Sequence, residues 1–171
     1  RDGIIDKDFL RKHRFYDTFL HFGIDDEQLA QYFEKHFLDE IINFNELIPQ
    51  TIEVLEYLKE KGYQLHVVSN GFHEVTNRKV EKSGLKKYFE TVTSAEDAHA
   101  MKPDERIFEY SLNLANAEKS ESIFIGDDWV ADVKGAQNFG LDIIFFDALK
   151  ENKTEEGLKT IQNLEEIKNF L

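Results

Sequence analysis

The chain has 171 residues, a formal net charge of −13 and no cysteine. This length suggests one hydrophobic core with at most a small appended subdomain, and the lack of cysteine excludes disulfides and thiolate metal sites. The negative charge argues against binding to polymeric nucleic acid or an anionic membrane, and no apolar run is long enough to span one. We therefore expect a cytoplasmic protein with a small ligand.

Residues 1 to about 45 carry two helical patterns and no convincing strand. Asp6 is placed to cap the first helix and Asp25 the second. We interpret Asp25 and Asp26 as acids at a helix start rather than as metal ligands, because the positive end of the helix dipole favours acids there. Residues 1–45 are thus expected to form a helical subdomain.

Residues 46–171 alternate between helical and strand patterns. The expected strands are 64–68, 88–93, 123–125 and 142–146, and the expected helices begin near residues 49, 72, 103 and 130, with a last helix over 161–171. This alternation predicts an α/β core with a mostly parallel sheet and right-handed crossovers.

Polar residues stand where these strands end. Ser69-Asn70-Gly71 follows one strand, Asp127 and Asp128 follow another with Asp132 one helical turn later, and Lys102 precedes a helix. In a parallel sheet all of them lie at one edge, where ligands bind. Together they offer a hydroxyl, backbone amides, a cation and carboxylates, which is the chemistry of a phosphate site with a Mg²⁺ ion.

Each of these features also has an ordinary structural explanation. Ser69-Asn70-Gly71 can be a simple turn, Lys102 a solvated surface lysine, and Asp127 or Asp128 a helix cap. His73 follows the Ser-Asn-Gly loop and could contact a substrate, since loops often carry function. The combination is more specific than its parts.

The motifs resemble those of the haloacid dehalogenase (HAD) superfamily. Residues 67–72 (Val-Val-Ser-Asn-Gly-Phe) look like its second motif, residues 101–108 around Lys102-Pro103 like its third, and residues 126–132 (Gly-Asp-Asp-Trp-Val-Ala-Asp) like its fourth. The match is closer to the branch with a helical cap, and especially to its pyrimidine 5′-nucleotidase-like members. The resemblance implies a Rossmann-like, HAD-type core (46–171) with a partial helical cap (1–45).

The resemblance also implies roles for individual residues. Ser69 and Asn70, with Gly71, would hold the transferring phosphoryl group, and Lys102 would neutralise the phosphate and the nucleophile. Asp127 would coordinate Mg²⁺, and Asp132 would support the metal directly or through water. Asp128 stands where the family more often has Ser, and the resemblance gives it no role.

One family motif has no counterpart in this sequence. The first motif, Asp-x-Asp at the end of the first strand, supplies the nucleophile and the general acid, and this strand lies between those that end at Ser69 and Asp127. Asp6-Lys7-Asp8 has the right spacing, but no apolar strand precedes it and a helix follows. We therefore expect a missing central strand, a gap of roughly 10 Å between its neighbours, and an incomplete cap.

The leading functional hypothesis is a Mg²⁺-dependent phosphatase of small phosphorylated metabolites, with nucleoside 5′-monophosphates as the first candidates. It would work through an aspartyl-phosphate whose aspartate lies upstream of Arg1, so these 171 residues alone are expected to be inactive. The main alternative is a non-catalytic phosphate- or metal-binding domain. Haloacid dehalogenation is a third hypothesis, against which the acidic cluster at Asp127 and Asp132 argues.

Overall fold

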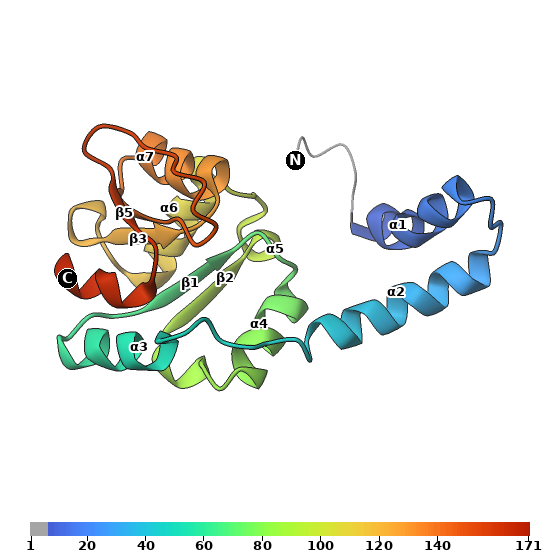
Figure 1. Cartoon of the computed structure of the whole chain (residues 1–171), viewed down its shortest axis with the longest axis horizontal. Helices are drawn as coiled ribbons and strands as arrows, with labels where there is room; N and C mark the ends of the chain where they lie inside the picture. The colour runs from blue at the N-terminus through green and yellow to red at the C-terminus, as the bar shows by residue number, and fades with distance from the viewer. Residues whose placement is uncertain (1–6) are drawn as a thin grey trace. The chain divides into compact units, whose positions relative to one another are not determined.

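The structure, a computed structural model, describes residues 7–171. The chain divides into two compact units, residues 1–45 and residues 46–171, and both are drawn in Figure 1. The cap predicted at Asp6 lies outside the described residues. Within them, no helix has both the length and the apolar character needed to cross a membrane.

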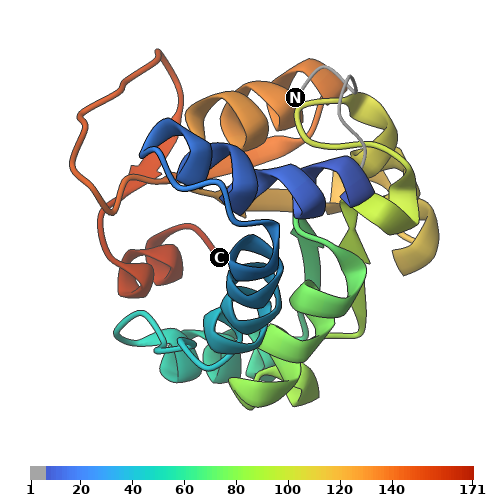
Figure 2. The same cartoon turned by 90° about the vertical axis from the view of Figure 1, so that its right-hand side faces the viewer.

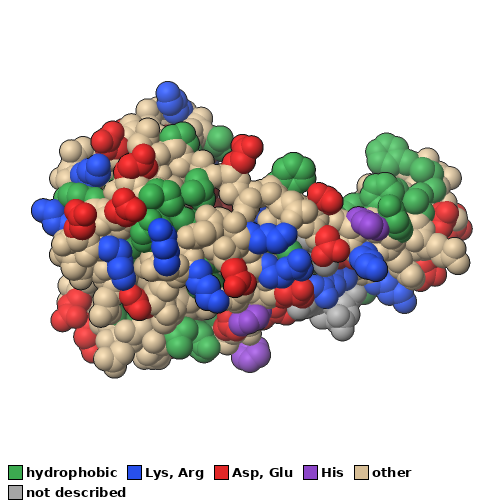
Figure 3. All heavy atoms as spheres, turned by 90° about the horizontal axis from the view of Figure 1, so that it is seen from below, with side chains coloured by type: hydrophobic (Ala, Val, Ile, Leu, Met, Phe, Trp, Pro, Cys, Tyr) green, Lys and Arg blue, Asp and Glu red, His purple; other side chains and the backbone are tan. Residues whose placement is uncertain are grey.

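The first unit is a pair of packed helices, α1 (Lys7–His21) and α2 (Glu27–Ile41). Aromatic rings form its interior, with Phe19 and Phe33 in edge contact at 5.2 Å between ring centroids. The Arg14 guanidinium pairs with the Glu34 carboxylate at 2.7 Å and ties the two helices together. Several apolar side chains remain exposed, and they gather visibly on this unit in Figure 3.

The start of α2 differs from the prediction. Asp26, not Asp25, is the N-cap, and its carboxylate accepts a hydrogen bond from the backbone of Leu29. Asp25 instead accepts a hydrogen bond from the Tyr16 hydroxyl at 2.8 Å. With two adjacent acids at a helix start, the sequence gives no means of telling which one caps.

The second unit is an α/β core. Its strands are β1 (His66–Ser69), β2 (Thr91–Ser94), β3 (Ile123–Gly126), β4 (Asp142–Phe146) and β5 (Lys159–Ile161). Its α-helices are α3 (Thr51–Glu60), α4 (His73–Lys82), α5 (Ala95–Ala98), α6 (Glu105–Ala115) and α7 (Gly135–Phe139). The predicted parallel α/β core is confirmed, because every strand pair in it is parallel.

The strands form two separate sheets. One has the order β1-β2, and the other has the order β3-β4-β5. Helices α3 and α4 lie on one side of the strands and α6 and α7 on the other (Figures 1 and 2). The carboxyl ends of the parallel strands share one edge, so the loops after β1, β2 and β3 lie there together.

Hydrophobic clusters pack against both faces of strand β4. Ile143 and Phe145 pack into one cluster with residues of α6 and α7, and Ile144 and Phe146 pack into another with residues of α3. Because side chains of a strand alternate between faces, a continuous apolar run such as 142–146 indicates a strand that is buried on both sides. That is why the sequence predicted this strand with its observed bounds.

Two predicted elements are placed differently. The strand expected over 88–93 begins at Thr91, because Tyr88 belongs to a 3₁₀ turn and its buried ring reaches Glu56 through a hydroxyl hydrogen bond of 3.1 Å. The final helix expected over 161–171 is instead strand β5 followed by a 3₁₀-helix, Leu164–Asn169. Ile161 is fully buried as a strand residue and thus follows the sheet rather than the helical pattern.

Candidate active site

A cavity of about 840 Å³ lies between β1 and β3. Much of its lining is apolar and comes from the two strands and the helices around them, including Val54, Val67, Phe108, Ile125 and Ile167. Strand β1 pairs only with β2, and β3 only with β4, so their facing edges have no partner strand among the described residues. We call this cavity the strand slot. It lies where the sequence predicted a missing central strand.

Lys102 lies at the carboxyl end of the strand slot. Its ammonium nitrogen is 2.6 Å from Oδ1 of Asp132, and it donates a hydrogen bond to the carbonyl of Val68 at 3.1 Å. Only 11% of the Lys102 side chain is exposed. This lysine is therefore not a solvated surface residue, since a buried ammonium is tolerated only where a partner compensates its charge.

Asn70 fixes the backbone of Lys102. The Asn70 side-chain oxygen accepts a hydrogen bond from the Lys102 amide at 2.7 Å, and its side-chain nitrogen donates to the Lys102 carbonyl at 3.0 Å. Both ends of the Asn70 amide are thus engaged with the chain, which makes Asn70 a positioning residue in this structure. The resemblance assigned Asn70 to the phosphoryl group, and that role stays a prediction. No local pattern indicated this contact between residues 32 positions apart.

Ser69 ends β1 with its hydroxyl in a compact turn. Ser69 Oγ accepts a hydrogen bond from the Gly71 amide at 3.0 Å and lies 3.4 Å from the Thr76 hydroxyl, which donates to it. With both acceptor positions used, the Ser69 proton is left to donate to an incoming oxygen. A Cβ at Gly71 would lie 2.7 Å from Thr76 Oγ1, so this close turn requires glycine.

Asp132 turns back toward the end of β3. Its Oδ2 accepts hydrogen bonds from the amides of Asp127 and Asp128 at 3.0 and 2.9 Å, and only 4% of the side chain is exposed. A Cβ at Gly126 would lie 2.5 Å from Asp132 Cβ, Cγ and Oδ2, so only glycine allows this approach. Asp132 thus joins the loop after β3 to Lys102.

The turn that follows β3 is π-helical over Trp129–Lys134. The amides of Asp132 and Val133 both donate to the Asp128 carbonyl, at 2.8 and 3.1 Å, and the second of these bonds spans five residues. The Asp128 carboxylate caps this turn by accepting from the amides of Val130 and Ala131. Asp128, to which the resemblance gave no role, is therefore the helix cap that the sequence allowed at Asp127 or Asp128. π-helical turns often occur at functional sites.

The residues around Asp127 suit a hard cation in their donor chemistry. Asp127 is exposed at the end of β3, and Asp132 Oδ1, although close to Lys102, is buried and has no aligned hydrogen bond. Carboxylate oxygens are the ligands that Mg²⁺ prefers, and it often takes only one or two of them beside phosphate and water. No group of three or more His, Cys, Asp or Glu residues in the described part of the chain is arranged to hold a metal.

Comparison with known protein families identifies the family of this chain. The model of the haloacid dehalogenase-like hydrolases matches residues 7–146. The chain belongs to this family. The earlier resemblance is confirmed, and the match covers both the helical unit and the core as far as the end of β4.

Two curated relatives of this chain are phosphatases. The chain is 30% identical over 145 residues to the pyrimidine 5′-nucleotidase PynA of Streptococcus pneumoniae, covering 83% of this chain and 60% of that protein. It is 32% identical over 111 residues to a ribulose-1,5-bisphosphate 5-phosphatase of Halopiger xanaduensis, covering 65% of this chain and 46% of that protein. The chain thus spans about half the length of these curated relatives.

Among solved structures, the HAD-hydrolase YfnB of Bacillus subtilis, which was solved with magnesium bound, superposes with a TM-score of 0.86. The match covers 99% of this chain and 74% of that protein at 23% identity, so it establishes the shared fold. The HAD-like fold predicted from sequence is confirmed by this likeness.

Proposed function

We propose that this chain is part of a Mg²⁺-dependent phosphatase of small phosphate monoesters, with nucleoside 5′-monophosphates as the leading substrate class. The observation that carries the proposal is the buried ammonium of Lys102 at the carboxyl end of the strand slot. A cation held in such a site by fixed partners is suited to bind the oxygens of a phosphoryl group and of an attacking carboxylate.

The nucleophile would be an aspartate on a strand encoded upstream of Arg1. That strand would enter the strand slot parallel to β1 and β3 and pair with both open edges. Its last residues would then lie beside Lys102, where the ammonium lowers the energy of a carboxylate. Attack of this carboxylate on phosphorus would release the alcohol and form an aspartyl-phosphate, which water then hydrolyses.

The described residues would hold the phosphoryl group from two sides. The Ser69 hydroxyl has a proton to donate, and Lys102 supplies a positive charge fixed by Asn70 and Asp132. Asp127, with Asp132 behind it, would hold Mg²⁺, and a bound Mg²⁺ ion would supply further positive charge to the phosphate oxygens. Residues 1–45 would form part of a cap and residues 46–171 the core.

The likeness to PynA supports a nucleotide as the substrate, and the Halopiger relative supports a phosphate monoester more broadly. A non-catalytic phosphate-binding domain is the second candidate. It is favoured by one observation: the described residues at the carboxyl end of the strand slot offer only the carboxylates of Asp127 and Asp132, both of which have other roles in the proposal.

Phosphate release separates the two candidates. The 171-residue chain and the proposed longer gene product, which would carry the upstream strand, are each assayed with p-nitrophenyl phosphate and nucleoside 5′-monophosphates, with and without Mg²⁺. Their intact masses are measured first. We expect Mg²⁺-dependent turnover from the longer protein only. Lys102→Ala in that protein should lose roughly 10- to 100-fold in rate, because a charge-assisted contact contributes about 1.5–3 kcal/mol.

The strand itself is tested by hydrogen exchange. Backbone amides of β1 and β3 that face the strand slot should exchange faster in the 171-residue chain than in the longer protein, because an added strand would hydrogen-bond them. The amides of β4, which already pair on both sides, serve as the internal control. Equal exchange at β1 and β3 in the two proteins, or turnover by the 171-residue chain alone, would contradict the proposal.

A further inference from the structure

A histidine to which the proposed function gives no role is held beside the candidate phosphate site. His73 is the first residue of α4. Its backbone amide donates to the Glu96 carboxylate at 2.6 Å, and its ring nitrogen Nδ1 lies 2.7 Å from Asp97 Oδ1. One ring nitrogen is therefore hydrogen-bonded to Asp97, while 58% of the His73 side chain is exposed to solvent.

Asp97 is itself held in place. Its Oδ2 accepts hydrogen bonds from the amide and the hydroxyl of Ser94 at 2.8 and 2.6 Å, and 22% of its side chain is exposed. Burial alone would raise the pKa of the Asp97 carboxyl, but the hydrogen bonds from Ser94 and His73 together keep that pKa below its usual value. Asp97 is thus an anion near neutral pH and accepts a hydrogen bond from His73.

This arrangement defines the chemistry of the free side of the ring. An ionised carboxylate only accepts hydrogen bonds, so Nδ1 carries the proton that faces Asp97. In the neutral imidazole the other nitrogen, Nε2, is then an acceptor. His73 therefore presents an oriented hydrogen-bond acceptor to whatever binds next to it.

The cluster lies next to Ser69. Ser94, which anchors Asp97, is the strand partner of Ser69 in the parallel pairing of β1 with β2, and neighbouring strands are about 4.8 Å apart. Thr76, in the first turn of α4, contacts Ser69 Oγ at 3.4 Å. The helix that carries His73 and the carboxylate that binds its ring are thus both anchored next to Ser69, the residue proposed to donate to the phosphate.

A purely structural role explains only part of this geometry. The contact between the His73 amide and Glu96 already caps the start of α4, and a solvent-exposed contact with a carboxylate adds little stability. The Asp97 contact instead fixes the tautomer and the direction of the ring, as in histidines that act through their second nitrogen.

We propose that His73 binds the leaving group of the substrate, with Nε2 accepting a hydrogen bond from a hydroxyl or amine of the alcohol part of the phosphate ester. The inference rests on the proposed phosphatase function, because it needs a phosphoryl group at Ser69 to position the ester. It makes His73 a residue that selects polar, hydroxyl-bearing leaving groups such as a nucleoside.

The test compares two substrates in the longer gene product. Uridine 5′-monophosphate has hydrogen-bond donors in its leaving group, and phenyl phosphate has none. For His73→Ala we expect KM for uridine 5′-monophosphate to rise about 3- to 10-fold, the effect of losing one neutral hydrogen bond, with kcat nearly unchanged. Both constants for phenyl phosphate should stay at their wild-type values.

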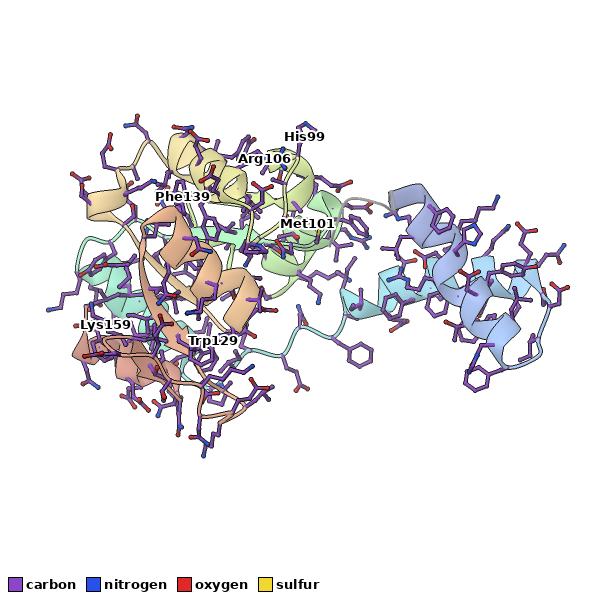
Figure 4. All side chains as sticks on the ribbon, turned by 90° about the horizontal axis from the view of Figure 1, so that it is seen from above. His99, Met101, Arg106, Trp129, Phe139 and Lys159 are labelled. Atoms are coloured by element: carbon purple, nitrogen blue, oxygen red, sulfur yellow. The ribbon has the colours of Figure 1, made fainter. Side chains whose placement is uncertain are left out.

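The matched control is His99→Asn. His99 is also exposed and precedes Lys102 by three residues, but its side chain points outward in Figure 4, and asparagine tolerates its left-handed backbone (φ 49°). This variant should leave both substrates unaffected.

An equal change for both substrates in His73→Ala, or no change for either, overturns the inference while the phosphatase function stands. Absence of turnover by the wild-type longer protein removes the proposed function and the inference with it.

Discussion

The contact between Lys102 and Asp132 offers a test that does not depend on catalysis. Asp132→Asn keeps an oxygen that can accept from the amides of Asp127 and Asp128, but removes the charge 2.6 Å from the Lys102 ammonium. The two side chains are only 11% and 4% exposed, so little water can replace the lost partner. Removing one member of a buried ion pair costs about 3–5 kcal/mol, because the other charge is left buried without a partner.

This loss should appear in urea or thermal unfolding of the chain. For a protein of this size about 1 kcal/mol shifts the melting temperature by roughly 2–4 °C, so we expect a decrease on the order of 6–20 °C. The double variant Lys102→Met with Asp132→Asn should be more stable than Asp132→Asn alone, because it no longer buries an unpaired ammonium.

Asp128→Asn is the control for this experiment. It makes the same chemical change in the same loop, but Asp128 caps the turn over Trp129–Lys134, where asparagine caps as well as aspartate. Its stability should stay within about 0.5 kcal/mol of the wild type. If Asp132→Asn melts at the same temperature as this control, or if the double variant is no more stable than Asp132→Asn alone, the ion pair does not contribute the stability assigned to it.

Three further predictions concern single residues. Asp127→Asn should weaken Mg²⁺ binding, measured by calorimetry on the longer gene product, and equal affinities would remove Asp127 as a ligand. Gly126→Ala should cost about 1–3 kcal/mol in unfolding, because its Cβ would lie 2.5 Å from the Asp132 side chain. Burial lowers the pKa of His66, so the folded state favours the neutral ring and stability should fall as the pH drops below about 6.5; in His66→Gln this part of the pH dependence should vanish.

Much of the core was predictable because burial leaves a local mark in the sequence. The strands at 123–126 and 142–146 are short apolar runs, and each ends at a change to polar residues. The ends of helices were less predictable, since Asp25 and Asp26 are equally good caps by composition. The start of β2 depended on Tyr88, whose buried ring contacts α3, a long-range contact with no local pattern.

The candidate site was predictable as a set of residues but not as a network. The sequence brings Ser69, Lys102, Asp127 and Asp132 to one edge, because carboxyl ends of parallel strands meet there. The sequence could not show that the Asn70 side chain forms hydrogen bonds with the backbone of Lys102, since that contact joins two loops. His73 was noticed only for its position after the loop, and its partner Asp97 follows a different strand.

The charges at this edge bear on why the proposed reaction would need a metal ion. Near the end of the strand slot, Lys102 is balanced by Asp132, and Asp127 adds a further negative charge. An aspartate nucleophile and a phosphate monoester would bring about three more. Anions gathered in a partly buried site repel one another and lose hydration, and one lysine that already pairs with Asp132 cannot offset this. A divalent cation at Asp127 would supply the missing charge where substrate and protein carboxylates would converge. The charge balance of these residues, as well as their oxygen donors, therefore supports the proposed use of Mg²⁺.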